Sequence, residues 1–491
     1  MLLRHALPAV LLLIPSAAVA QPAPDAALRA DLQARRARAL ERLGPDAIFV
    51  LPSAPARVYS ADVDYEYRQD SNLYYLTGID QEETTLVLMP GNPTRKEILF
   101  VRARDAAREH REGRRLSKEE ATARSGIETV HLASEMEPFL SAILSGRPFG
   151  FPRDREVHEF DAFFKALDEG RARVFLVLSP KPGLSDPLPE VYQLAGRLRE
   201  RFPMVGIADA SRILRELRQV KTPWEQQALR RSVAISSEAH REGMKAARPG
   251  AYEYEVEAAL EQVYLKRGAL GWGYPSIVAG GPNATILHYS KSRRRLEPGD
   301  LLLVDAACLY EYLTGDITRT YPVSGRFSEA QKAVYRIVLA AQEEAMKAAR
   351  PGVKTREVHA KTVEIVKKGL LELGLISDAS GDQYRTWYTH GSVHWIGMDV
   401  HDEGDYERPL APGMAFVIEP GIYLREDALD NLPPTPENRA FAEKVRPAFE
   451  KYKGIGVRVE DSFLLTDSGL EQLSASVPRT IDEVEAFLKG R

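Results

Sequence analysis

Short apolar runs that alternate with polar, helix-like stretches dominate the first 208 residues of the chain. A helical lead rich in arginine and alanine (residues 26–43) is followed by the runs AIFVLPS, TTLVLMP, EILFVRA and RVFLVLS. Apolar runs of this length are typical of buried strands, and their alternation with helices indicates an α/β arrangement. We therefore expect residues 21–209 to form an N-terminal α/β domain.

The pattern changes near residue 210, where long amphipathic stretches replace the short runs. Helical spacing of apolar positions predicts helices over residues 224–247, 328–349 and 355–373, and the pair Thr222-Pro223 is a typical helix start. Isolated strands lie between these helices. Residues 210–491 are thus expected to form a second domain, with a proline-rich loop and helix at 427–454 as a surface excursion from it.

The segment LLLVDAACLYEYLTGDITRT (residues 301–320) has the pattern of a buried hairpin, yet it carries two aspartates. With a two-residue turn at Tyr310-Glu311, Asp305 and Asp316 would be directly opposite, with their Cβ atoms about 5 Å apart on one face. Two like charges at that distance raise one pKa strongly unless a cation neutralises them. The alternative is a pair of strand ends exposed to water.

Three histidines and two further carboxylates suggest a polar cavity. His390, His394 and His401 fall within twelve residues, although the chain has only ten histidines. Glu419 ends an apolar run before a Pro-Gly turn. Glu460 lies in GIGVRVEDSFLL, whose alternation places Arg458 and Glu460 on one face of a strand and Val457 and Val459 on the other.

Counting charges indicates what such a set could hold. Four carboxylates and a neutral histidine carry a charge of about −4 near neutral pH, which balances two divalent cations. Oxygen-dominated ligands favour ions such as Mn²⁺, Co²⁺ or Mg²⁺ over a thiolate-rich zinc site. Two such ions can lower the pKa of a bridging water and hold it as a nucleophile toward a carbonyl carbon. The buried acids therefore predict a dinuclear metal site.

The order of these residues and the motifs around them resemble the pita-bread metallopeptidases, and specifically the aminopeptidase P family. The catalytic motifs are DAACLYEYLTGDITRT, HGSVHWIGMDVHD, IEPGIY and GIGVRVED, with IVAGGPNATILHYS as the first histidine motif. YEYRQDSNLYYLTGIDQEE (residues 65–83) and the later GRRLS resemble the family's N-terminal domain. The resemblance implies a mixed α/β (α+β) fold, with an N-terminal α/β domain followed by a pita-bread catalytic domain.

The resemblance implies a metal-binding role for five residues. Asp316 and Glu460 would bridge the two ions, Asp305 would complete one ion, and His394 and Glu419 would complete the other. The first expectation for the ions is Mn²⁺, with Co²⁺ or Zn²⁺ as alternatives. Glu419 would also take the proton of the attacking water, since it would already contact that water.

The resemblance also implies residues that contact the substrate. His288 and His401 would touch the scissile amide and stabilise the oxyanion or carry a proton to the leaving nitrogen. His390, Tyr423 and Arg458 match positions near an apolar pocket for a proline ring. Arg458 could instead pair with Glu460 or a neighbouring acid as structural support.

The implied activity is that of an Xaa-Pro aminopeptidase, a hydrolase that releases the first residue of peptides with proline second. Two alternatives remain open: an Xaa-Pro dipeptidase (prolidase) with the same five ligands, and a non-catalytic peptide-binding protein of the same fold. The resemblance further implies a homo-oligomer, either a dimer or a tetramer. Some members close a neighbouring subunit's site with an aromatic pair, but this chain has Arg111 and Glu112 there.

Composition and the N-terminus indicate where the protein acts. A net charge of −4 with 28% charged residues is typical of an acidic soluble protein, and no basic run suits a nucleic-acid partner. Residues 1–20, MLLRHALPAVLLLIPSAAVA, predict a cleaved signal peptide, because a membrane anchor needs about 18 or more apolar residues in a row. Cys308 is the only cysteine and is expected to be a small buried hydrophobe. We therefore expect an exported protein, periplasmic or secreted, with no membrane attachment after signal cleavage.

Overall fold

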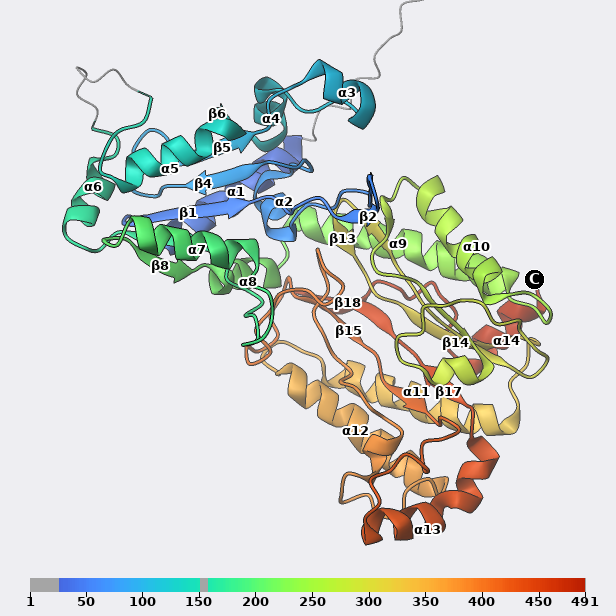
Figure 1. The fold of residues 1–491 in the computed structure, drawn as a ribbon. Coiled ribbons are helices and arrows are strands. Elements are labelled where there is room, and N and C mark those ends of the chain that lie inside the picture. The colour runs from blue at the N-terminus through green and yellow to red at the C-terminus, as the bar shows by residue number, and fades with distance from the viewer. Residues whose placement is uncertain (1–25, 151–157, 491) are drawn as a thin grey trace, which may run out of the picture.

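The structure, a computed structural model, describes residues 26–150 and 158–490. We call the described residues up to 209 the N-terminal unit, which runs from blue to green in Figure 1. Those from 210 onward form the C-terminal unit, which runs from green to red. Both units contain helices and strands. The predicted signal peptide lies outside the described residues. Among the residues that are described, no helix is long and apolar enough to cross a lipid bilayer.

A six-stranded sheet in the order β6-β5-β4-β1-β7-β8 forms the centre of the N-terminal unit. Its strands are β1 (Ala47–Pro52), β4 (Thr85–Leu88), β5 (Glu97–Val101), β6 (Thr129–Leu132), β7 (Arg173–Leu176) and β8 (Gly206–Asp209). The strands β1, β4 and β5 are antiparallel, whereas the pairs β1–β7, β7–β8 and β5–β6 are parallel. The four apolar runs of the sequence lie in β1, β4, β5 and β7, which confirms their prediction as strands.

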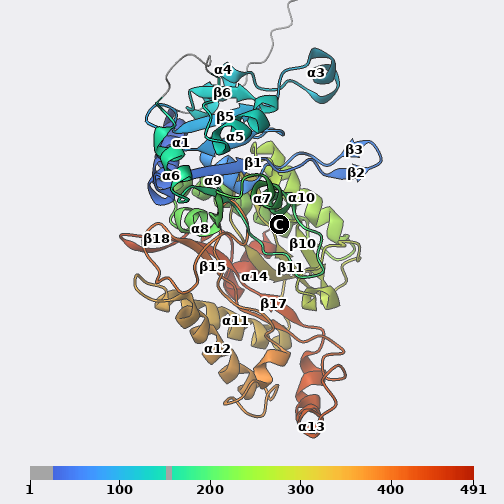
Figure 2. The same ribbon diagram turned by 60° about the vertical axis from the view of Figure 1, so that its left-hand side comes forward.

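Helices cover both faces of this sheet, so alternate residues of each strand enter two different cores. In β1, Phe49 and Leu51 pack toward α1 and α2, whereas Ile48 and Val50 pack toward α5, α6 and α7. The helices of the unit are α1 (Ala26–Leu43), α2 (Ser71–Thr77), α3 (Ala106–Glu112), α4 (Lys118–Ser125), α5 (Met136–Leu144), α6 (Asp161–Asp168) and α7 (Glu190–Arg201), with a 3₁₀ turn η1 (Ala133–Glu135). A short hairpin of β2 (Val58–Ser60) and β3 (Val63–Asp64) projects from the unit, as Figure 2 shows.

The C-terminal unit is built from pairs of long helices that cover small antiparallel sheets. Its helices are α8 (Ser211–Gln219), α9 (Pro223–Ala246), α10 (Glu253–Lys266), α11 (Glu329–Ala348), α12 (Thr355–Glu372), α13 (Pro436–Tyr452) and α14 (Ile481–Lys489), with 3₁₀ turns η2 (Gly281–Thr285) and η3 (Gln383–Thr386). The three long helices expected from the sequence are α9, α11 and α12. Thr222 and Ser328 cap α9 and α11, since each hydroxyl accepts from the backbone N–H three residues later, at 3.2 Å.

Three-stranded sheets of the order β10-β11-β14 and β15-β18-β19 carry the acidic motifs. The strands of the whole C-terminal unit, which also form the sheets β13-β12-β9 and β16-β17, are β9 (Gly271–Trp272), β10 (Ile277–Gly280), β11 (Leu301–Asp305), β12 (Cys308–Tyr310), β13 (Leu313–Thr314), β14 (Thr318–Pro322), β15 (Ala415–Ile418), β16 (Gly421–Tyr423), β17 (Gly456–Arg458), β18 (Asp461–Thr466) and β19 (Gly469–Gln472). A bridge between Thr318 and Glu460 joins the two sheets, so their acidic strand ends meet.

The hairpin register predicted for residues 301–320 is wrong by two residues. Asp305 is paired with Thr318 rather than with Asp316, and the turn lies at Glu311-Tyr312, whose φ values are 49° and 62°. Two positive φ angles match the right-handed twist of a hairpin, but the usual Asn-Gly signal for such a turn is missing from the sequence. The expected burial of Cys308 is confirmed.

Helix α13 corrects the expectation of a surface excursion. The loop before it is mostly exposed, but the helix buries Phe441, Val445 and Phe449 in the largest core, and Phe449 stacks on Trp387 with ring centroids 5.4 Å apart. The apolar spacing of this helix was hidden by the prolines around it. Figures 1 and 2 show α13 at the end of the C-terminal unit that lies farthest from the N-terminal unit.

Candidate metal centre and active site

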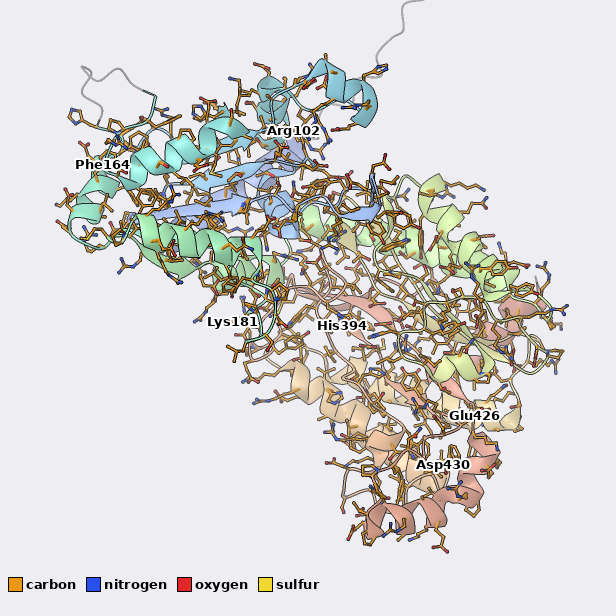
Figure 3. All side chains as sticks on the ribbon, viewed as in Figure 1. Arg102, Phe164, Lys181, His394, Glu426 and Asp430 are labelled. Carbon is orange, nitrogen blue, oxygen red and sulfur yellow. The ribbon has the colours of Figure 1, made fainter. Side chains whose placement is uncertain are left out.

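Four carboxylates reach one buried place from four different strand ends. Asp305 ends β11, Asp316 precedes β14, Glu419 follows β15, and Glu460 lies between β17 and β18. His394, labelled in Figure 3, joins them from the loop that precedes β15. Because each residue sits where a strand ends, the backbone turns away and leaves room between the side chains.

The imidazole of His394 is surrounded by three of these carboxylates. Its Nε2 lies 3.5 Å from Asp316 Oδ2 and 3.5 Å from Glu419 Oε1, and 3.8 Å from Glu460 Oε1. Its Nδ1 lies 3.1 Å from the carbonyl oxygen of Trp395, which can only accept, so Nδ1 carries the proton. The lone pair of Nε2 is therefore directed at the carboxylates, as in a metal ligand.

The two aspartates meet although they are not cross-strand partners. The hydroxyl of Tyr274 lies 2.8 Å from Asp305 Oδ1 and 2.5 Å from Asp316 Oδ1. The prediction that these carboxyls come together therefore holds, for a different geometric reason. Tyr274 itself was missed, because a tyrosine 31 residues before Asp305 gives no pattern that links it to the hairpin.

Burial controls the protonation of the cluster in the absence of an ion. Burial, reinforced by neighbouring carboxylates, raises the pKa of Asp316, Glu419 and Glu460 well above the usual range. Burial also tends to raise the pKa of Asp305, but the charge of Arg458 and the hydrogen bonds from Tyr274 and Arg458 together lower that pKa. The guanidinium of Arg458 therefore balances only part of the negative charge that four ionised carboxyl groups would carry.

The donor set fits divalent metal ions. Ligand atoms of Asp316, His394 and Glu460 all lie within 4.8 Å of one another, which a single ion could span. Glu460 Oε2 accepts from Thr318 Oγ1 at 2.6 Å, but the buried Oε1 has no hydrogen-bond partner among the described residues. A buried carboxylate oxygen without a donor is unfavourable unless a cation binds it.

Arg458 lies between the cluster and a second group of polar side chains. Its Nη2 donates to Asp305 Oδ2 at 2.5 Å and its Nη1 to the hydroxyl of Tyr423 at 2.8 Å. Of the two roles left open from the sequence, pairing with a neighbouring acid is thus observed, and that acid is Asp305. Its contact with Tyr423 keeps it beside the expected proline pocket as well.

His390 is the third member of that group. Its Nδ1 lies 2.7 Å from the carbonyl oxygen of Gly391 and 3.6 Å from Glu419 Oε2, and its Nε2 lies 2.8 Å from the hydroxyl of Tyr423. Burial and the charge of Arg458 lower the pKa of His390 to about 3. His390 is therefore a neutral imidazole that accepts from Tyr423.

A cavity of about 450 Å³ opens onto the cluster. The expected substrate-contacting histidines both line it: His288 from the loop after η2, and His401 with its ring edge-on to His394 at a centroid distance of 4.5 Å. Its remaining lining residues are Leu287, Asp305, Asp316, His390, Gly391, Val393, His394, Tyr406, Glu419 and Arg458. All sequence-predicted site residues except Tyr423 and Glu460 thus line one cavity, and those two contact residues that line it.

Glu253 is a second residue that the sequence did not single out. It is completely buried at the start of α10, yet its carboxylate is fully hydrogen-bonded to the segment that carries His288. Its partners are Gly280 N, Asn283 Nδ2, Tyr289 Oη and Arg294 N. An acid at a helix start is common on protein surfaces, so its position alone gave no signal.

Comparison with known proteins agrees with this arrangement. Residues 227–467 match Metallopeptidase family M24, and residues 32–149 match the aminopeptidase P N-terminal domain. The chain is 34% identical over 470 residues to the Xaa-Pro aminopeptidase of Escherichia coli strain K12, covering 94% of this chain and 98% of that protein. It is also 35% identical over 303 residues to the Xaa-Pro dipeptidase of Homo sapiens, covering 56% of this chain and 61% of that protein.

Solved structures give the same result. The structure of aminopeptidase P from E. coli with the inhibitor Pro-Leu superposes with a TM-score of 0.77 at 32% identity, covering 94% of this chain and 98% of that chain. An aminopeptidase of Pseudomonas aeruginosa superposes with a TM-score of 0.78 over the same shares. The expected order of an N-terminal α/β domain and a pita-bread domain is confirmed. This chain therefore belongs to the aminopeptidase P group of metallopeptidase family M24.

Proposed function

We propose that the protein is an exported Xaa-Pro aminopeptidase that uses two divalent metal ions. The observation that carries this proposal is the convergence of four carboxylates and one histidine on a cavity lined by further histidines; Asp305, Asp316, His394 and Glu460 are buried, and Glu419 is partly buried. Asp305, Asp316, His394, Glu419 and Glu460 would hold the ions, in the arrangement expected from the family resemblance. Similarity over nearly the whole chain to proteins named Xaa-Pro aminopeptidase supports the substrate class.

Bound divalent ions would supply a Lewis acid and lower the pKa of an attacking water. Glu419 would accept the proton of that water, since its carboxylate lies at the edge of the cluster and lines the cavity. His401 and His288 face the same space, where a neutral imidazole can donate to the developing oxyanion or pass a proton to the leaving nitrogen. Burial and His288 lower the pKa of His401, which favours the neutral form.

A proline after the scissile bond demands particular surroundings. The prolyl nitrogen of the substrate has no N–H, so the site must give it a proton and receive an apolar ring. Leu287, Val393 and Tyr406 supply apolar lining. The neutral His390, held by Tyr423, lies beside Glu419 and completes the wall of this pocket.

Export and oligomerisation are further parts of the proposal. The signal-peptide pattern of residues 1–20 supports export, and a mature protein that begins at Gln21 by mass spectrometry would establish it.

We also propose a homo-oligomer. Glu112 lies at the end of the exposed α3, with its Oε1 3.5 Å from Arg108 Nε, so a charged surface rather than an aromatic pair would face a partner's site. Light scattering would measure the oligomeric state.

The nearest alternative is an Xaa-Pro dipeptidase, because the human dipeptidase is 35% identical over 303 residues. Dipeptidases must recognise the free carboxylate of the prolyl residue, so peptide length separates the two activities. Purified mature protein with added Mn²⁺ should release the first residue of Xaa-Pro-Xaa tripeptides. Cleavage of Xaa-Pro dipeptides alone would establish the dipeptidase instead. Tight peptide binding without cleavage, at full metal occupancy, would indicate a non-catalytic binding protein.

A further inference from the structure

A buried group of charges lies where the loop that carries His401 meets the rest of the protein. The side chains of Arg218, Lys221 and Asp402 are only 2%, 1% and 1% exposed. Removing a charge from water is unfavourable unless partners compensate for it. In the described part of the chain, none of their hydrogen bonds reaches the five proposed metal ligands, so the metal centre does not explain why these charges are buried.

Two cations hold the carboxylate of Asp402, one at each oxygen. Arg218 Nη2 donates to Oδ1, and Lys221 Nζ donates to Oδ2 at 2.8 Å. The same guanidinium donates to Asp399 Oδ2 at 2.6 Å and to Asn72 Oδ1 at 2.8 Å. Arg218 therefore links both aspartates that flank His401 to the N-terminal unit.

The N-terminal unit makes its own contacts with the same loop. Arg68 Nη2 donates to the carbonyl oxygen of Met398 at 2.9 Å and to Asp399 Oδ1 at 3.2 Å. Ser71, at the start of α2, donates to the same oxygen of Asp399 at 2.9 Å. Segments that are more than 300 residues apart in sequence thus fix this loop together.

The loop has little freedom to move at this place. The backbone N–H of Asp402 donates to the carbonyl oxygen of Trp395 at 2.9 Å and closes the loop. Gly397 packs so closely that a Cβ atom there would lie 2.0 Å from Asp402 Oδ2 and 2.9 Å from Lys221 Nζ. Any shift of the ion pair would therefore displace the backbone around it.

His401 depends on that backbone for its position. Its ring has a T-shaped contact with His394, but in the described residues it makes no hydrogen bond of its own. A side chain without a hydrogen bond takes its place from the backbone to which it is attached and from packing. Asp402 is the next residue along the chain, so its anchor is the nearest fixed point.

We infer that Arg218 is a positioning residue that holds His401 at the substrate through Asp402 and Asp399. This inference rests on the proposed function, because it assigns His401 to the scissile amide. It also gives the N-terminal unit a part in catalysis, since Asn72, Arg68 and Ser71 complete the anchor. The competing explanation is that these ion pairs only join the two units.

Steady-state kinetics on a double-mutant cycle tests the inference. With an Xaa-Pro-Xaa tripeptide and saturating Mn²⁺, Arg218→Met should lower kcat about 100-fold, the scale expected when a reacting group is misplaced by about 1 Å. KM and the metal content should stay unchanged. In a His401→Ala background, Arg218→Met should cause no further loss of kcat, because it acts through His401.

Arg35→Met is the matched control. Arg35 is also buried and pairs with Asp31 and, at 3.9 Å, with Glu225, and it donates to the carbonyl oxygen of Tyr75 at 3.1 Å. It thus joins α1 to α9 and α2 but has no contact with the His401 loop. Its loss should lower the thermal midpoint and leave kcat unchanged. If Arg218→Met does not fold, Arg68→Ala replaces it, because that side chain is 39% exposed; kcat should then fall about 3- to 10-fold, again only when His401 is present.

Two results would overturn the inference in an active enzyme. One is an equal loss of kcat with and without His401, and the other is an unchanged kcat in Arg218→Met or, where that variant does not fold, in Arg68→Ala. A wild-type protein that binds metal and cleaves no Xaa-Pro peptide would instead overturn the proposed function, and this inference with it.

Discussion

The carboxylate of Glu253 should be one of the most sensitive positions outside the metal cluster. It is completely buried, and it holds the segment of residues 280–294 that carries His288. Its Oε1 accepts from Gly280 N at 2.7 Å and Asn283 Nδ2 at 2.9 Å. Its Oε2 accepts from the hydroxyl of Tyr289 and the N–H of Arg294, both at 2.8 Å.

The substitution Glu253→Gln replaces one of these two oxygens by an NH₂ group, which can only donate. The least unfavourable orientation places this group beside Tyr289, whose hydroxyl can rotate and accept from it. The backbone N–H of Arg294 then loses its acceptor, and the remaining bonds lose the contribution of the negative charge. An unsatisfied buried N–H costs about 1–3 kcal/mol, and with the weakened bonds we expect a loss of about 2–4 kcal/mol in unfolding free energy.

Urea unfolding followed by tryptophan fluorescence measures this loss in the right part of the chain. All four tryptophans lie between residues 224 and 395, so the signal reports the C-terminal unit. Glu255→Gln is the matched control, because it lies in the same helical turn and is 42% exposed, and its one ion-pair partner among the described residues is Arg248, at 4.0 Å. We expect a change below about 0.5 kcal/mol there. Equal stabilities of the two variants would refute the assigned role of Glu253.

Two further predictions concern the metal cluster and the His401 loop. Because burial raises the pKa of Asp316, Glu419 and Glu460, the metal-free folded protein binds more protons than the unfolded chain above about pH 4. The contribution of these protonated carboxyl groups to the stability of the metal-free protein is therefore lost as pH rises. Metal binding, by contrast, needs the deprotonated carboxylates. The rise in thermal midpoint on adding Mn²⁺ to EDTA-treated protein should therefore grow from about pH 5 to about pH 8, and a constant rise would contradict this reasoning. Gly397→Ala should cost about 1–3 kcal/mol of unfolding free energy through overpacking against Asp402. Gly391→Ala, where a Cβ would meet nothing within 4 Å, should leave the unfolding free energy nearly unchanged. Similar losses of unfolding free energy in both variants would argue against close packing of the loop at Gly397.

Local patterns were enough to predict much of the fold. Each strand of the N-terminal sheet found from the sequence is a short apolar run, and burial on both faces explains why the run is continuous rather than alternating. The start of α9 was predicted because Thr222 followed by Pro223 is a typical helix start in any context, and α11 was predicted from its apolar spacing. The metal cluster could be predicted because burying a carboxylate in an apolar strand is unfavourable unless a cation compensates for its charge.

Features that depend on distant contacts left no such signal. The turn at Glu311-Tyr312 takes positive φ angles without glycine or asparagine, so the hairpin register was predicted two residues away from its true place. The contact of Tyr274 with Asp305 and the ion pair of Arg218 with Asp402 join residues 31 and 184 positions apart. Such pairs are set by tertiary packing, which no local periodicity records.

The most direct test of the account is the rate at which the mature protein releases the first residue of an Xaa-Pro-Xaa tripeptide, measured while Mn²⁺ is titrated into the metal-free enzyme. Wild-type activity should rise until two ions are bound per chain. Glu419→Gln should lose at least about 100-fold in kcat at full metal occupancy, since a general base contributes about that much or more. Activity that needs no divalent ion, or a Glu419→Gln variant with an unchanged rate, would contradict the assignment of this cluster as the catalytic centre.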